Sequence, residues 1–119
     1  ARYHQQHAGD WVVRLGDGTE ESAARLRAAL ERAWPYTHEM FTRDGVDTAA
    51  EAAGLGPARD ALLADWLRDV AAVFGEAGLE VPVGTPFMST GTQGRHSEHM
   101  GFILAEMQSL QRQFPGGRW

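Results

Sequence analysis

Hydrophobic residues recur along most of this chain every three or four positions, the spacing of amphipathic helices, and show little of the alternation typical of strands. The first such segment covers about residues 1–15, where His4, Ala8, Trp11 and Leu15 share one stripe. The glycines of Gly16-Asp17-Gly18 predict its end, because glycine suits the left-handed position that follows a helix. The short gap to the next segment predicts a hairpin of two antiparallel helices.

The second helical segment is expected over about residues 19–41, with Thr19 as its N-cap. Glu20 and Glu21 lie in the first turn, where the helix dipole favours anions. Because proline lacks an amide hydrogen, Pro35 should bend or locally break this helix near Glu31. The apolar stripe consists of Leu26, Leu30, Ala33, Thr37 and Phe41, with Trp34 beside it.

A third long helix is expected over about residues 57–77, opened by Pro57 at the first helical position and closed by Gly78. The loop before it includes a predicted short helix at Thr48–Ala53, with Asp47 as candidate cap. The predicted buried face of the long helix consists of Leu62, Leu63, Trp66, Leu67, Val70, Val73 and Phe74.

Residues 79–94 are expected to be irregular, since two prolines and three glycines exclude a helix. A brief extended piece at Val81–Val83 fits this loop, whose length suits docking on a partner. The last helix is expected to begin near Ser97 as N-cap and to end at Pro115-Gly116-Gly117. Trp119 is a candidate anchor for a neighbour, or a disordered end. The elements together predict an all-α fold.

The composition fits one domain and excludes several classes of protein. With 119 residues, 43% of them apolar, the chain can build a single core. The absence of cysteine excludes disulfides, iron–sulfur clusters and thiol catalysis. A net charge of −5 argues against a nucleic-acid-binding face, and no apolar run is long enough to span a membrane. We therefore expect a soluble, cytoplasmic protein.

Two histidine pairs are the main candidates for chemistry, and the first is His4 with His7. Residues three apart on a helix can reach one metal, or one of them can belong to a Glu-x-x-His pair of a di-iron site. Position 1, however, is Ala rather than Glu. We favour the alternative, in which both are core or interface histidines with hydrogen-bonded rings.

The second pair is His96 and His99, with Glu98 between them. Imidazole and carboxylate groups both suit zinc or iron. His96, however, lies before or at the expected helix start, so the two rings need not converge, and the helix dipole alone explains Glu98. We favour the alternative of a polar helix start that holds the preceding loop.

Several stretches carry a resemblance to a known family. The most specific is His96-Ser97-Glu98-His99-Met100-Gly101, which continues through Leu104-Ala105-Glu106-Met107-Gln108-Ser109-Leu110-Gln111-Arg112. Others are Ala1-Arg2-Tyr3-His4, Arg14-Leu15-Gly16-Asp17-Gly18-Thr19 and Glu39-Met40-Phe41. Together they resemble the C-terminal half of the PaaC-type subunit of ring-1,2-phenylacetyl-CoA epoxidase, over essentially the whole chain.

The resemblance implies a ferritin-like antiparallel helical bundle, present here as a C-terminal partial bundle in one domain over residues 1–119. It also implies a role in aerobic phenylacetate degradation. The implied complex is a bacterial monooxygenase that epoxidises the ring of phenylacetyl-CoA with oxygen and electrons from a separate reductase. Its catalytic subunit holds the di-iron centre, and the PaaC-type subunit is a non-catalytic relative that pairs with it. The helical pattern already running at Ala1, with no cap residue, suggests a start inside a helix of a longer protein.

One register position bears on that implied role. The resemblance places Glu-x-x-His of the catalytic relative where this chain reads Ala1-Arg2-Tyr3-His4. We therefore expect no cofactor in this chain, a di-iron partner subunit in a hetero-oligomer, and exposed apolar area along residues 1–15. The alternative is a metal-binding ferritin-like oxidoreductase subunit that uses His4 and His7, or His96 and His99.

Overall fold

The computed structural model describes residues 1–118, and its regular elements in this range are helices, which confirms the all-α class. The helices are α1 (Arg2–Gly16), α2 (Glu20–Ala33), α3 (Gly45–Ala52), α4 (Leu63–Glu76), α5 (His99–Met107) and α6 (Ser109–Gln113). Strands are absent from the described part, apart from one isolated antiparallel bridge between Thr90 and Arg95. The helices are consistent with a ferritin-like bundle family. None of these helices is long and apolar enough to cross a membrane.

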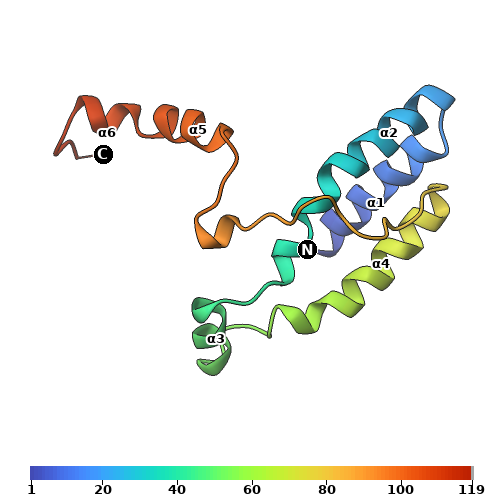
Figure 1. The fold of residues 1–119 in the computed structure, drawn as a ribbon, viewed down its shortest axis with the longest axis horizontal. Coiled ribbons are helices and arrows are strands. Elements are labelled where there is room, and N and C mark those ends of the chain that lie inside the picture. Colours follow the sequence, from blue (N-terminus) through green and yellow to red (C-terminus); the bar gives the residue numbers. More distant parts are fainter. Residues whose placement is uncertain (119) are drawn as a thin grey trace. The chain divides into compact units, whose positions relative to one another are not determined.

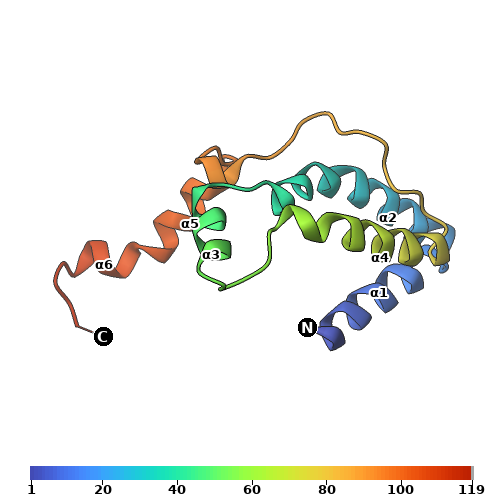
Figure 2. The same ribbon diagram turned by 90° about the horizontal axis from the view of Figure 1, so that it is seen from below.

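The chain divides into two compact units, Ala1–Ser89 and Thr90–Trp119. In the first unit, α1 contacts both α2 and α4, and the three helices lie side by side in two perpendicular views (Figures 1 and 2). The second unit contains α5 and α6. Trp119, the candidate anchor, lies outside the described residues.

The expected hairpin of the first two helices is confirmed, together with its cap. The Thr19 hydroxyl accepts a hydrogen bond from the Ser22 amide at 3.2 Å. The Ser22 hydroxyl in turn donates to the Leu15 carbonyl at 2.7 Å. Because this second bond joins the start of α2 to the end of α1, it stabilises the turn between them.

Of the two expected effects of Pro35, a bend or a local break, the structure shows the break. The α-helix ends at Ala33, and the chain continues as two 3-10 turns, Trp34–Tyr36 and His38–Phe41. The expectation of one helix to residue 41 was therefore wrong. A proline ring collides with the carbonyl four residues earlier, here that of Glu31, and offers no amide hydrogen in return.

The short helix also begins earlier than expected, and Asp44 rather than Asp47 is its cap. The Asp44 carboxylate accepts from the amides of Val46 and Asp47, at 2.8 and 3.0 Å. The Asp47 carboxylate accepts from the Asp44 amide at 3.1 Å, which completes a capping box. Asp47 is thus the third helical residue rather than the cap.

The third long helix begins six residues after Pro57, so the prediction of Pro57 at its first position was wrong. A 3-10 turn at Asp60–Leu62 leads into α4. The Arg59 side chain fixes the segment that precedes this turn, since its Nε atom donates to the Met40 carbonyl at 3.0 Å. Gly78 closes the helix with a φ of 66°, as expected.

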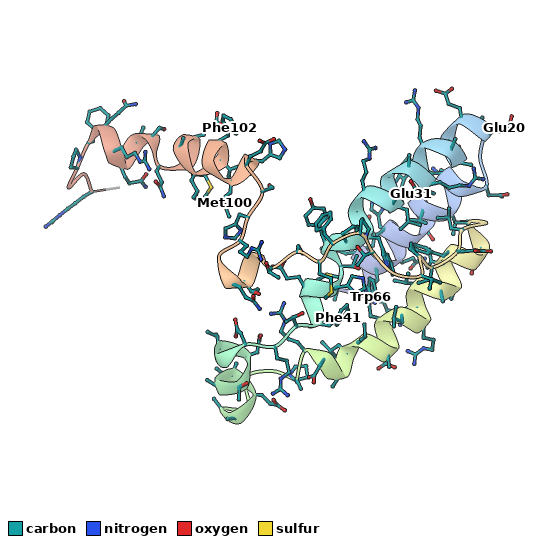
Figure 3. The ribbon with its side chains drawn as sticks, viewed as in Figure 1. Glu20, Glu31, Phe41, Trp66, Met100 and Phe102 are labelled. Atoms are coloured by element: carbon teal, nitrogen blue, oxygen red, sulfur yellow. The ribbon has the colours of Figure 1, made fainter. Side chains whose placement is uncertain are left out.

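An aromatic cluster forms the core of the first unit. Trp34, only 5% exposed, stacks on Trp66 with ring centroids 5.7 Å apart and contacts Phe74 at 6.3 Å. Phe41 packs on Trp66 at 5.1 Å, and Figure 3 shows these two side chains close together. The predicted buried face of α4 is only half-buried at Trp66 and Phe74, whereas Leu62 and Leu63 before and at its start are exposed.

The irregular stretch after α4 is confirmed, and no strand forms at Val81–Val83. The expectation that Ser97 caps the last helix was wrong. Helix α5 begins at His99 with Glu98 as its N-cap, and no side chain bonds to its first amides. A break at Gln108 separates α5 from α6, so the last helix is two short ones.

Candidate functional site

His7 of the first histidine pair belongs to an exposed row of side chains along α1, which consists of Tyr3, His7, Trp11 and Arg14. The His7 ring stacks on Tyr3, with centroids 5.9 Å apart, and meets the edge of Trp11 at 6.5 Å. The Arg14 guanidinium lies 5.2 Å from the centre of the Trp11 ring, a cation–π distance. Neighbouring aromatic rings thus hold His7, and no acidic group belongs to the row.

His4 lies beside this row, with its ring 5.8 Å from that of Tyr3. Ala1 is in the same turn, because its carbonyl accepts the Gln5 amide at 3.1 Å. A side chain at position 1 would therefore be a helical neighbour of His4. The methyl group of Ala1 offers no atom that could bind a metal.

The opposite side of α1 packs against α4 at very short range. A Cβ atom added to Gly9 would lie 3.4 Å from a methyl group of Val73, and one added to Gly16 would lie 2.3 Å from the Ala77 carbonyl oxygen. Between the two helices lies an apolar groove of about 250 Å³, lined partly by Val12 and Trp66. Glycines on α1 therefore permit the close approach to α4.

The exposed apolar area expected along residues 1–15 is confirmed. Tyr3 is 73% exposed and Trp11 47%, although both lie on a helix of the first unit. Tyr, Trp and Arg are the residue types that contribute most at protein interfaces. The row on α1 therefore has the composition of a binding surface.

The second histidine pair lies at the start of α5 in the second unit. His96, Glu98 and His99 are all exposed, and Glu98 is the N-cap residue. Throughout residues 1–118, no group of three or more histidine or carboxylate side chains could hold a metal ion. The structure thus does not bring either pair into a set of donors for a di-iron centre.

Long-range polar contacts anchor α3, and no pattern in the sequence indicated them. Arg59 pairs with Asp47 at 3.2 Å, twelve residues away, and Arg43 pairs with both Glu51 and Asp60. Partial desolvation acts to raise the pKa of the Asp47 carboxyl. The Asp44 amide and the Arg59 guanidinium outweigh it, so the pKa of Asp47 is below its ordinary value.

Three buried polar atoms lie at the break after α2: Trp34 Nε1, His38 Nε2 and Ser89 Oγ. None has a hydrogen-bond partner among the described residues. The Ser89 amide donates to the Pro35 carbonyl at 3.3 Å, which places the loop against this break. Trp34 and His38 lie in the 3-10 turns that replace a continued helix at this break.

Large apolar side chains also remain exposed on α5 and α6. Phe102 and Met107 are 73% and 70% exposed, and Phe102 projects from α5 in Figure 3. After Ser89, no described residue is buried. The second unit therefore has exposed apolar side chains and no buried core among its described residues.

The helical fold agrees with what the sequence comparisons show. The chain belongs to the family described as phenylacetic acid catabolic protein, whose model matches residues 1–119. The chain is 40% identical over all of its 119 residues to the C subunit of 1,2-phenylacetyl-CoA epoxidase from Escherichia coli (strain K12). It spans 48% of that relative, about half of its length. The resemblance noted from the sequence is thereby confirmed.

Proposed function

We propose that this chain belongs to a non-catalytic structural subunit of a multicomponent phenylacetyl-CoA ring epoxidase, which pairs with the di-iron catalytic subunit and stabilises it. Family membership and the relative, itself named as one subunit of an epoxidase, support a place in such a complex. The activity, substrate and partner of the whole protein are part of this proposal.

The observation that carries the non-catalytic role is the identity of residue 1. Ala1 lies one turn before His4 on α1, where the resemblance implies the Glu of a Glu-x-x-His pair. A di-iron site needs carboxylates that bridge or bind the metals, and a methyl group can do neither. The described residues therefore do not fit a di-iron centre, and no reaction step is assigned to them.

The exposed surfaces on α1 and α5 support the pairing. Apolar residues that stay in water cost free energy, and large apolar patches on proteins usually mark interaction sites. The formal charge of −5, the aromatic side chains exposed on α1 and the apolar side chains exposed on α5 fit a protein partner better than a nucleic acid.

The test uses the full-length protein that contains this chain, purified alone and after co-expression with the catalytic subunit. Elemental analysis should find iron near zero in the protein alone, and iron in the complex in proportion to the catalytic subunit. The two should co-purify at a fixed ratio, and a catalytic subunit expressed alone should be less stable.

Histidine variants separate this proposal from the metal-binding alternative. We expect His4→Ala and His99→Ala to leave the iron content and the oxygen consumption of the assembled complex within about twofold of the wild type. About one metal per chain in the isolated protein, lost in either variant, would instead establish a metal site here. Failure of the wild-type protein to co-purify with the catalytic subunit would show that it has another partner.

A further inference from the structure

The segment that contains α3 leaves the packed helices of the first unit and returns beside its own starting point. In Figure 1 the chain runs out to α3 and back to the start of α4. Where it returns, Arg59 Nε donates to the Met40 carbonyl at 3.0 Å, and the Asp60 carboxylate lies 3.6 Å from Arg43. The two ends are therefore bound to each other. We call residues 43–60 the α3 loop.

Apolar packing contributes little to the position of the α3 loop. Its large apolar side chains, Val46 and Leu55, are 76% and 81% exposed, and none of residues 43–60 is buried. Extensive contacts in the first unit join α1 to α2 and to α4, whereas α3 makes no contact of that extent with another described helix. Segments with few buried apolar contacts open at low free-energy cost, so the α3 loop can separate while the rest stays folded.

Two arginines instead connect α3 to the base of its loop. Arg43, where the loop begins, pairs with Glu51 near the end of α3 and with Asp60 beyond it. Arg59, where the loop returns, pairs with Asp47 in the first turn of α3 at 3.2 Å. Each guanidinium thus joins the helix to the chain at the base. We call Arg43 and Arg59 the arginine latch.

The ion pairs of the arginine latch are accessible to solvent. The side chains of Arg43 and Arg59 are 34% and 33% exposed, and their carboxylate partners are between 20% and 57% exposed. Salt weakens such pairs, because the Debye length falls from about 10 Å at 0.1 M to about 3 Å at 1 M ionic strength. The aromatic cluster around Trp34 contains no charged group, so the same salt should not weaken it.

We propose that the α3 loop opens as a separate unit of the fold, which the arginine latch holds closed and which salt releases. Opening moves residues 43–60, while Phe41, two residues before the loop, stays packed on Trp66 with ring centroids 5.1 Å apart. The contacts involved all lie within the first unit, so the opening does not depend on the proposed function.

The test is hydrogen–deuterium exchange of the full-length protein that contains this chain, followed by mass spectrometry of its peptides. The pH is kept constant, and sodium chloride is raised from about 0.1 M to about 1 M. We expect amide exchange in α3 to become at least about threefold faster, because ion pairs close the loop. Exchange in α2 and α4 should change less than about twofold, since apolar contacts hold these helices.

Variants assign the effect to the arginine latch. Arg43→Gln and Arg59→Gln should each speed exchange in α3 at low salt by about threefold or more, and the double variant should lose the salt dependence. The matched control is Arg68→Gln, because Arg68 pairs with Asp65 and Asp69 within α4 and joins no distant segments. This control should leave exchange in α3 within about twofold of the wild type.

Three results would overturn the inference. Exchange in α3 at the rate of α2 and α4 under every condition would show that the loop opens only when the whole protein unfolds. Exchange in α3 that neither salt nor the variants change would show that other contacts close the loop. Unprotected α3 amides in the wild type at low salt would show that the loop is never closed. If a variant also speeds exchange in α2 and α4, the salt series on the wild type decides, since it changes no residue.

Discussion

The contact between Gly16 and Ala77 sets the position of α1 against α4, and Gly16→Ala tests it. A Cβ atom at position 16 would lie 2.3 Å from the Ala77 carbonyl oxygen and 2.8 Å from the Ala77 Cβ. Carbon atoms normally approach to about 3.5–4.0 Å, so one helix must move. Ala77 is 3% exposed, and its amide donates to the Val73 carbonyl at the end of α4. It therefore cannot withdraw without disturbing that helix end.

The expected magnitude follows from two opposing effects. Overpacking of a close contact costs about 1–3 kcal/mol. Alanine is preferred over glycine in a helix by about 1 kcal/mol at most, and less at the last helical residue. We therefore expect Gly16→Ala to lower the free energy of unfolding by about 1–2 kcal/mol. Gly75→Ala on α4 is the matched control, since no atom lies within 4 Å of its added Cβ.

The assay is urea unfolding followed by far-ultraviolet circular dichroism, with the three proteins compared at one concentration. Gly16→Ala should lower the denaturation midpoint. Gly75→Ala should leave the midpoint unchanged, or raise it through a gain of up to about 1 kcal/mol in the free energy of unfolding. A Gly16→Ala protein as stable as the wild type would refute the close approach of the two helices. Equal destabilisation by both variants would attribute the effect to glycine loss in general.

Three further predictions concern the core and the polar contacts of the first unit. Trp34→Ala should lower the free energy of unfolding by about 3–5 kcal/mol in the same assay, because it empties the centre of the aromatic cluster; a loss below about 1 kcal/mol would contradict that packing. Asp47 has a lowered pKa when folded, so its contribution to stability is present above the unfolded pKa and is lost as the pH falls through the folded value. The free energy of unfolding of Asp47→Asn should therefore fall less than that of the wild type as the pH drops below about 4. The same pH dependence in both proteins would count against the contacts of Asp47 with Asp44 and Arg59. Thr19→Ala should cost about 1 kcal/mol through loss of the cap on α2, whereas Thr19→Ser should restore most of it.

The order of helices and turns could be predicted from the residues alone because its causes are local. The stripe through Leu15, the cap at Thr19 and the proline at position 35 each act within about one turn. The resemblance to the epoxidase subunit was also readable from short stretches. His4 and His7 were placed on the correct helix in the same way, and His99 at the start of the last one.

Errors arose where two local signals competed or where a contact between distant residues acted. Asp44 and Asp47 are both good cap residues, and the cap is the one whose own backbone is extended where α3 begins. In the structure that residue is Asp44. Pro57 is a good first residue for a helix, yet Arg59 is bound to a carbonyl nineteen residues away and to a carboxylate twelve residues away. Contacts between residues so far apart along the chain produce no regular spacing that could be recognised in a sequence.

The sequence by itself determined that this chain is helical, where its main turns lie and which family it resembles, since these depend on neighbouring residues. Only the tertiary structure decided how closely α1 approaches α4 and which apolar stripes are buried. A periodic stripe shows that a helix has an apolar face, but burial depends on what packs against it. That is why α4 and α5, both apolar in sequence, differ: Trp66 lies in the aromatic cluster, whereas Phe102 faces water.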